Sequence, residues 1–286
     1  TSHGYLNNNQ MQDITAIELS RRGIAVIAMD AYFHGDSSAT EDVLFTIFTD
    51  AMGMIPLVEY AYYNLDYVDN TKIGVTGHSM GGMNTWSTLQ YYGKLYRQAL
   101  EVAAAPDSDG GSEITEAEQA YADAQNKVAA GFPTSQVAEQ VFAIAGADMT
   151  VEKFYQDIHA NIGVNLGYYD ENGYVFTRKN SDLSGDCPES LYFINYFLPE
   201  EQQITSVEIG KFYGSVEEEN LRVVYNPKEI HPWQHFSHQS SEHMCEFFTT
   251  AFQVETPLEL GDQLWFYKEL FNFIGLIGVV LAIVPM

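Results

Sequence analysis

The chain has 286 residues, of which 46% are hydrophobic and 14% aromatic, enough to build a packed core and too many for a disordered protein. Its 39 acidic and 13 basic residues give a formal net charge of −26. This charge repels nucleic-acid phosphates and disfavours docking on anionic lipid through a basic patch, so we expect no nucleic-acid partner.

The first part of the chain predicts alternating strands and helices. Residues 1–4 have the pattern of the end of a strand, so we expect the first strands of the sheet to be missing from this sequence. Residues 11–22 carry apolar side chains at helical spacing. Residues 24–29 form a continuous apolar run that suits a parallel strand buried on both faces. Residues 43–65 predict a helix bent at Pro56.

The middle and later parts continue the alternation. Residues 107–160, rich in Ala, Glu and Gln, predict an inserted helical cap. Strands are expected at residues 72–76, 99–105, 161–166 and 221–225, and helices at residues 82–92 and 240–252. Strands that alternate with helices indicate an α/β fold with a mostly parallel sheet flanked by helices.

The C-terminal stretch is strongly apolar. Residues 270–286 carry a single polar residue, Asn272, and their length of 17 lies near the lower limit of about 17–25 residues for a membrane span. Residues 265–267 are Trp, Phe and Tyr and are similar to an interfacial aromatic belt. We expect residues 257–286 to be a linker and a truncated transmembrane helix that associates the protein with a membrane. A buried C-terminal helix is the alternative.

Residues 77–81, Gly-His-Ser-Met-Gly, fit the pattern G-x-S-x-G between an expected strand and an expected helix. A serine hydroxyl is a poor nucleophile until a base removes its proton. A tight strand-to-helix turn exposes the hydroxyl, and the flanking glycines leave room for that turn. The same turn aims the first amides of the helix at a developing oxyanion. These features predict Ser79 as a nucleophile.

Three segments carry a resemblance to a known family. Residues 68–82 (VDNTKIGVTGHSMGG) resemble the strand, turn and helix around the nucleophile of many esterases and lipases. Residues 24–37 (IAVIAMDAYFHGDS) resemble the preceding strand and its loop, with Phe-His-Gly where Gly-His-Gly is usual. Residues 2–5 (SHGY) resemble the H-G-x turn that follows the third strand. On these residues the chain resembles the α/β-hydrolase superfamily.

The resemblance implies the layout of the protein and part of its site. It implies an α/β-hydrolase domain over residues 1–256, with the cap at about 107–160 as an insertion and the N-terminal strands missing. In the family, the amide after the H-G turn and the amide after the nucleophile bind the oxyanion. These amides would belong to Tyr5 and Met80. No cofactor is implied.

The family order of serine, acid and histidine implies an acid loop after Ser79. Residues 142–148 end in Asp148, and residues 161–171 contain Asp170. The second segment has the strand, the turn glycine and a G-x-x-D-E pattern similar to the family's acid loop. We therefore expect Asp170 to orient the catalytic histidine, with Asp148 as the alternative.

The general base is expected just after the last strand, where His231, His235 and His238 lie within eight residues. A pKa near 6.5 lets histidine take and return a proton near neutrality. A short loop after the strand fits His231, and His235 is the rival because the last helix begins soon after it. His231 and His235 at i, i+4 also have the spacing of metal ligands, but no H-E-x-x-H pattern supports a metal site. We expect no metal.

These residues together predict a serine hydrolase that cleaves carboxylic ester bonds of small molecules, a carboxylesterase or lipase-like enzyme with an acyl-enzyme intermediate. The acidic surface favours uncharged or apolar acyl groups. The fold alone does not fix the reaction. A peptidase, thioesterase or acyltransferase, and a non-catalytic hydrolase-like binding module of a membrane protein, are the alternatives.

Overall fold

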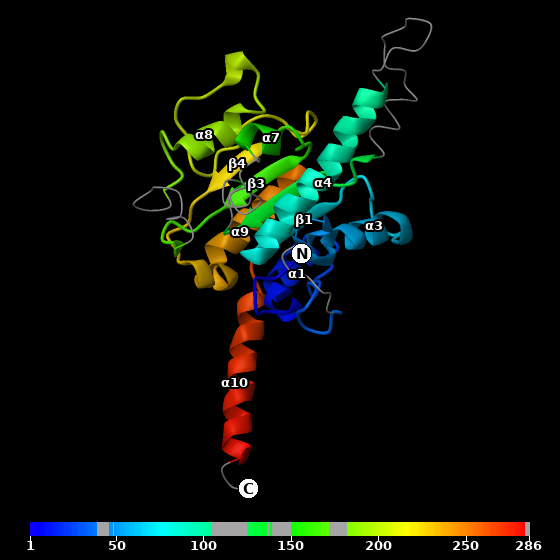
Figure 1. The fold of residues 1–286 in the computed structure, drawn as a ribbon. Coiled ribbons are helices and arrows are strands. Elements are labelled where there is room, and N and C mark those ends of the chain that lie inside the picture. Colours follow the sequence, from blue (N-terminus) through cyan, green and yellow to red (C-terminus); the bar gives the residue numbers. More distant parts are fainter. Residues whose placement is uncertain are drawn as a thin grey trace, which may run out of the picture.

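The computed structural model describes residues 1–38, 46–47, 49–103, 125–135, 138, 150–171 and 182–283 (Figure 1). Its strands are β1 (Gly74–His78), β2 (Ala130–Thr134), β3 (Asn161–Asn165) and β4 (Arg222–Tyr225). Its α-helices are α1 (Asp13–Ser20), α3 (Met54–Asn64), α4 (Met80–Ala103), α7 (Val151–Tyr155), α8 (Pro188–Asn195), α9 (His238–Ala251) and α10 (Trp265–Ile283). Short 3₁₀ helices are η1 (Asn9–Gln12), η2 (Ala51–Gly53), η4 (Glu200–Gln202) and η5 (His231–Phe236).

The four strands form one parallel sheet in the order β1-β2-β3-β4. Because every strand runs the same way, all of their carboxyl ends lie at one edge of the sheet. In α/β folds ligands bind outside this edge. The loops that follow β1, β2, β3 and β4 therefore meet there.

Two extended segments continue the sheet beyond β1. Ser2 forms parallel bridges to Gly77 of β1 and to Met29. The amide of Ser2 donates to the carbonyl of Thr76 at 3.0 Å, and the amide of Met29 donates to the carbonyl of Thr1 at 3.2 Å. The apolar run at 24–29 thus lies beside residues 1–2 at the place expected for a strand, although isolated bridges join it rather than a continuous ladder.

Helices cover both faces of the sheet, as the predicted α/β class requires. Trp86 of α4 packs in one core cluster with Ile162 and Val164 of β3. Phe132 of β2 packs in the other cluster with Phe247 of α9, their ring centroids 5.2 Å apart. Because successive strand residues point to opposite faces, β4 supplies Val224 to the first cluster and Val223 and Tyr225 to the second.

Two predictions for the middle of the chain are wrong. Residues 99–103 of the strand expected at 99–105 are instead the end of α4, and residues 104–105 lie outside the described residues. The last residues of α4 favour a helix, and Arg97 pairs with Glu101 one turn later and with Asp157. The cap expected over 107–160 contains β2, a strand paired on both sides in the sheet. Pro133 masked this strand, because proline in a run argues against a central strand.

The helix expected at 43–65 is interrupted before Pro56 and not bent at it: residues 46, 47 and 49 are helical, and α3 follows as a separate helix. The chain has positive φ at Ala51, Met52 and Gly53, and α3 starts only at Met54. Pro56 therefore lies in the first turn of α3, where a missing N–H costs no intrahelical bond. Residues 39–45, which include the start of the predicted helix, lie outside the described residues.

The C-terminal helix α10 extends away from the rest of the protein (Figure 1). It has 19 residues, begins five residues before the predicted apolar stretch, and is long and apolar enough to cross a membrane. Of its residues only Trp265 is buried. The alternative of a buried C-terminal helix does not hold for the described part of this segment.

Candidate active site

Ser79 lies in a strained turn between the end of β1 and the start of α4. Its φ is 56°, in the left-handed region that few residues other than glycine adopt. A Cβ atom on Gly77 would lie 2.5 Å from the backbone of Gly81 and 2.6 Å from the carbonyl oxygen of Ser2. A Cβ on Gly81 would overlap that same oxygen. The turn therefore packs so closely against Ser2 that only glycine fits at positions 77 and 81, two residues before and two residues after Ser79.

The loop after the first extended segment lies directly beside Ser79. A Cβ on Gly4 would lie 3.5 Å from the Cβ of Ser79. Tyr5 follows Gly4 in the chain, so its amide belongs to the segment that lies beside Ser79. Met80 is the first residue of α4, where backbone amides have no acceptor within the helix. The two amides predicted to bind an oxyanion thus come from segments on either side of Ser79.

Two histidines hold this loop in place. The Nε2 atom of buried His3 accepts a hydrogen bond from the amide of Ala31 at 3.1 Å, and its Nδ1 donates to the carbonyl of Gly4 at 2.8 Å. The Nε2 atom of His34 accepts from the amide of Leu6 at 3.2 Å. Burial lowers the pKa of His3, which favours the neutral ring that these bonds require.

Asp170 and His231 form a direct pair at the same edge of the sheet. Asp170 is fully buried, and both of its carboxylate oxygens lie 3.0 Å from Nδ1 of His231. The carbonyl of His231 accepts a hydrogen bond from Nε2 of His78 at 3.0 Å, and the two rings lie 4.6 Å apart. Because His78 directly precedes Ser79, this contact joins the backbone of His231 to the residue before the serine.

Backbone hydrogen bonds join the loop after β3 to the loop after β4. The amide of Tyr168 donates to the carbonyl of Pro227 at 2.7 Å, and that of Tyr169 donates to the carbonyl of Glu229 at 3.0 Å. A Cβ on Gly167 would lie 2.5 Å from the Glu229 oxygen, so this approach requires glycine. These bonds hold the two loops together and so bring the acid to the histidine.

Residues 2–136 match the family described as the alpha/beta hydrolase fold. This match covers 135 of the 286 residues and supports the α/β-hydrolase superfamily as the family that the chain resembles. The matched region contains Ser79 and the loop with Tyr5, and it ends before Asp170 and His231. No curated protein matches the chain at a significant level. The assignment of the two later residues of the candidate triad therefore depends on the geometry described above.

The other two histidines of the cluster occupy different surroundings. The ring of His235 packs 3.9 Å from that of His78, and burial, followed by neighbouring histidines, lowers its pKa to about 4. The ring of His238 packs 4.9 Å from Trp265 at the start of α10. His231 is thus the histidine whose ring meets the buried acid. In the part of the chain that the structure describes, no three His, Cys, Asp or Glu side chains are grouped to hold a metal ion.

Two further residues bind the acid, and the sequence analysis missed both. The hydroxyl of Ser135 donates to Oδ2 of Asp170 and lies 2.5 Å from Nδ1 of His231. Nε2 of Gln234 donates to the same carboxylate oxygen at 2.8 Å. Ser135 directly follows β2, so its position at the carboxyl end of a strand was hidden once that segment was assigned to a cap. Asp148, the rival acid, lies outside the described residues.

A buried polar group behind Asp170 fixes the orientation of Gln234. Nδ2 of Asn165 donates to Oε1 of Gln234 at 3.2 Å, which leaves the amide nitrogen of Gln234 to donate to the acid. The same Asn165 nitrogen donates to the hydroxyl of Ser240 at 3.1 Å. The Oδ1 atom of Asn165 accepts a hydrogen bond from Nδ1 of His243 at 2.8 Å. The carboxylate is therefore held by side chains that are themselves hydrogen-bonded.

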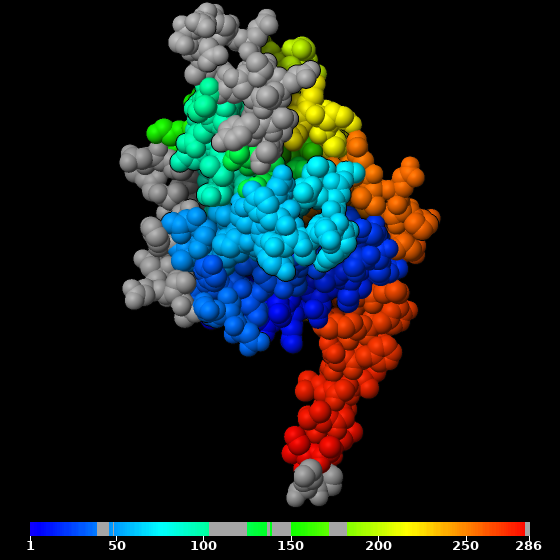
Figure 2. Space-filling view, turned by 90° about the vertical axis from the view of Figure 1, so that its right-hand side faces the viewer, coloured from blue at the N-terminus to red at the C-terminus, as the bar shows by residue number. Residues whose placement is uncertain are grey.

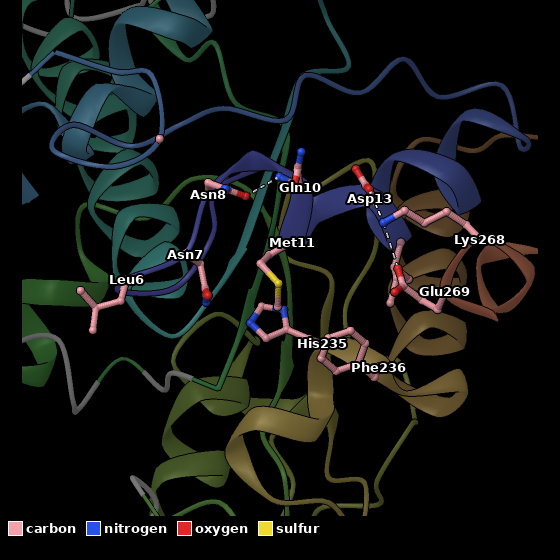
Figure 3. Close-up of a pocket in the computed structure, with 12 residues that line it drawn as sticks. Leu6, Asn7, Asn8, Gln10, Met11, Asp13, His235, Phe236, Lys268 and Glu269 are labelled. Carbon is pink, nitrogen blue, oxygen red and sulfur yellow. Dashed lines mark hydrogen bonds and ion pairs between the residues drawn. The ribbon is translucent and has the colours of Figure 1, made fainter. Parts of the chain in front are cut away.

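A cavity of about 540 Å³ lies beside this centre and reaches the base of α10 (Figure 3). His235 and Phe236 line it on the side of the catalytic loops, and Lys268 and Glu269 line it on the side of α10. The remaining lining comes from Gly35 and the N-terminal segment, namely Leu6, Asn7, Asn8, Gln10, Met11, Asp13 and Ile14. The cavity adjoins the catalytic residues through His235 and does not include Ser79 in its lining.

Proposed function

We propose that this α/β hydrolase cleaves carboxylic esters with Ser79 as nucleophile, His231 as general base and Asp170 as the acid that orients the histidine. One observation carries the proposal. Ser79, in its strained turn, follows a residue whose ring bonds to the backbone of His231, and Nδ1 of that histidine faces buried Asp170. The proposed nucleophile, base and orienting acid are thus linked by one chain of contacts that runs through His78.

The geometry supports a two-step acyl transfer. With its Nδ1 proton directed at Asp170, His231 has a neutral Nε2 that can take the proton from Ser79 Oγ as this oxygen attacks the ester carbonyl. The carbonyl oxygen becomes an oxyanion that the amides of Tyr5 and Met80 bind. His231 then returns the proton to the alcohol, which leaves an acyl group on Ser79. A water molecule, activated in the same way, releases the acid and restores the serine.

The test is labelling with a fluorophosphonate probe, which reacts with activated serines, followed by peptide mapping. We expect the adduct on Ser79 and no labelling of Ser79→Ala. Ser87→Ala is the matched control, because Ser87 lies two turns along α4 and outside the proposed triad. Labelled enzyme should lose the ability to hydrolyse p-nitrophenyl acetate. A folded wild-type chain that does not react would contradict the proposal and favour a hydrolase-like binding module.

We also propose that α10 anchors the protein in a lipid bilayer. Its 19 helical residues are about 28 Å long, close to the roughly 30 Å of a bilayer's hydrocarbon core. The apolar side chains along it are exposed, including Phe271 and Leu281 at 65% each, which water disfavours and lipid accepts. The full chain should float with phosphatidylcholine vesicles and stay bound in high salt and at alkaline pH. Recovery in the aqueous fraction would contradict the anchor.

A further inference from the structure

The start of α10 is fixed to the hydrolase domain by a buried carboxylate. Oε1 of Glu18 accepts hydrogen bonds from the amides of Leu264 and Trp265 at 2.7 and 3.0 Å. Oε2 of Glu18 pairs with Arg22 at 3.1 Å, and both side chains are fully buried. A carboxylate at the first amides of a helix also interacts favourably with the helix dipole. The first turn of α10 is therefore held by Glu18 of α1, whose carboxylate is in turn held by Arg22.

Two more contacts set the direction of α10. Nζ of Lys268 lies 2.6 Å from the carboxylate of Asp13 at the start of α1. Trp265 is only 4% exposed and packs against His238. The helix thus leaves the domain in a defined direction, from the face formed by the N-terminal segment (Figures 1 and 2). If α10 enters a bilayer, this face meets the lipid surface.

The same face carries an apolar rim around the cavity beside the catalytic centre. Leu6 is 80% exposed, and Trp233, between His231 and His235 in the chain, is 60% exposed. The rings of Trp233 and Phe236 lie 6.4 Å apart, and the cavity runs from Leu6 and Phe236 to the first turn of α10 (Figure 3). The apolar rim consists of the cavity-lining residues Leu6 and Phe236, the ring partner Trp233 and the neighbouring Tyr5, each of them exposed.

We propose that the apolar rim rests on the bilayer, so that the catalytic centre opens toward the membrane and takes a lipid ester as its substrate. This proposal rests on the proposed function and names the substrate class of the same site. A rim that faces the same cavity as the base of an exposed apolar helix is suited to lipid, because one bilayer surface can contact both. Aromatic side chains are favoured at the depth where a bilayer meets water.

The charges near the rim select the kind of lipid. The net charge of −26 opposes an anionic surface, and Lys268 at the helix base is already paired with Asp13 and Glu269. Asn7, Asn8 and Gln10 give the cavity uncharged donors and acceptors that can bind a polar head group. We therefore infer a neutral or zwitterionic lipid ester, such as an acylglycerol or a phosphatidylcholine.

Trp233 provides a direct test of orientation. Of the three tryptophans, Trp86 is fully buried and Trp265 is 4% exposed, so Trp233 is the one that a solvent or lipid quencher reaches most easily. The full chain is inserted into phosphatidylcholine vesicles whose acyl chains carry bromine, a fluorescence quencher. We expect quenching in the wild type that is largely lost in Trp233→Phe, and little quenching of Trp233 by aqueous iodide.

Two other results would overturn the orientation. Quenching of Trp233 by iodide and not by brominated lipid would mean that the rim faces water. Protection of Trp233 from both quenchers would mean that protein, such as a second copy of the chain, covers the rim. Because the measurement needs no turnover, it decides the orientation whatever the enzyme's reaction is.

The substrate class is tested by comparing two esters with the same enzyme in vesicles. Trp233→Ser should lower hydrolysis of a long-chain fluorogenic acylglycerol held in phosphatidylcholine vesicles about tenfold, because it weakens contact with lipid. Hydrolysis of soluble p-nitrophenyl acetate should stay within about twofold of wild type. Val102→Ser, at the opposite end of α4 and 72% exposed, is the matched control and should change neither rate.

Equal loss of both activities in Trp233→Ser, or no loss of either, would overturn the inference that the substrate is a lipid ester. Hydrolysis of the acetate with no hydrolysis of the vesicle-held ester would do the same while leaving the proposed function intact. If neither ester is cleaved and Ser79 does not react with fluorophosphonate, the proposed function itself fails. The failure of the substrate inference and the failure of the hydrolase are therefore distinguishable.

Discussion

The nucleophile side and the acid–base side of the candidate site are built in different ways. On the nucleophile side, five consecutive residues, 77–81, turn tightly against residues 2–4, and steric fit decides which residue types are allowed. On the acid–base side, Ser135, Asp170 and His231 follow three different strands and meet through hydrogen bonds. The first side depends on local sterics and the second on long-range polar contacts.

This difference means that the two sides should fail differently. Crowding the nucleophile side forces backbone atoms apart, so its defects should appear as lost stability. Removing a hydrogen bond on the acid–base side leaves the backbone in place, so its defects should appear as lost turnover. The following changes test that contrast.

The largest effect is expected for Asp170→Asn. An Asn side chain can present its NH₂ group to Nδ1 of His231, which favours the wrong tautomer, and cannot stabilise the imidazolium. We expect kcat for p-nitrophenyl acetate to fall about 10⁴-fold with little change in melting temperature. Asp69→Asn, a change of the same kind at an exposed turn, should keep wild-type kcat. Full activity of Asp170→Asn would eliminate Asp170 as the acid.

Gly77→Ala should damage the nucleophile side through stability. The new methyl group would press on the backbone of Gly81 and Ser2, which cannot move without opening the sheet. We expect the free energy of unfolding to fall by about 3 kcal/mol. Gly275→Ala in α10 is the matched control: a Cβ there meets nothing within 4 Å, so stability should not fall. Urea denaturation of both variants measures the difference, and equal stability would argue against a sterically closed turn.

A buried titrating group is the exception to this contrast, because charging it costs stability: acid should lower the free energy of unfolding through His243, which lies behind the acid–base side. Burial lowers its pKa from 6.5 to about 4, so between these values the unfolded chain binds a proton that the folded chain does not. This effect on stability is absent above pH 6.5, grows as the pH falls, and levels off below about 4. Protonation of His243 in the unfolded chain lowers the free energy of unfolding by at most about 3 kcal/mol.

Unfolding free energies measured from pH 7.5 to 4.5 should therefore fall less steeply in His243→Gln than in the wild type. Gln keeps a side chain able to donate to Asn165 but carries no titrating group. His238→Gln, at an exposed position, serves as the control. Parallel pH profiles for His243→Gln and wild type would show that His243 is not held neutral by burial.

The smallest effect is expected for Ser135→Ala. This change removes one hydrogen bond to Asp170 and leaves those from Gln234 and His231. We expect kcat to fall about tenfold with KM unchanged, because the hydroxyl orients the acid and does not reach the substrate. Ser184→Ala on an exposed turn should have no effect. A rise in KM without a change in kcat would mean that Ser135 contributes to substrate binding instead.

Much of the fold was predictable from local patterns. The strands β3 and β4 and the helix α9 lie within one or two residues of the expected ranges, because their apolar runs and helical spacing are undisturbed by proline. The middle of the chain was not predictable in this way. Pro133 and the small residues around Phe132 concealed a strand whose stability comes from packing against α9 and from two neighbouring strands.

The candidate site shows the same difference between parts with a local sequence signal and parts without one. Ser79 and the loop with Tyr5 were readable because G-x-S-x-G and S-H-G-Y are short, contiguous patterns. Ser135 and Gln234 left no comparable signal, because neither residue type is unusual and their partners are 35 and 64 residues away. The sequence favoured His231 over His235 from loop length alone, whereas the structure adds the 3.0 Å contact between Nδ1 of His231 and Asp170.

The sequence by itself determined the α/β class, the nucleophile turn and the apolar C-terminal segment, because each follows from interactions between residues close in the chain. Only the tertiary structure decided which histidine meets Asp170, which side chains hold that carboxylate, and how α10 leaves the domain. Those outcomes depend on contacts between segments far apart in the chain, such as Glu18 with Leu264 and Trp265. Such contacts form only when the sheet brings its loops and helices together.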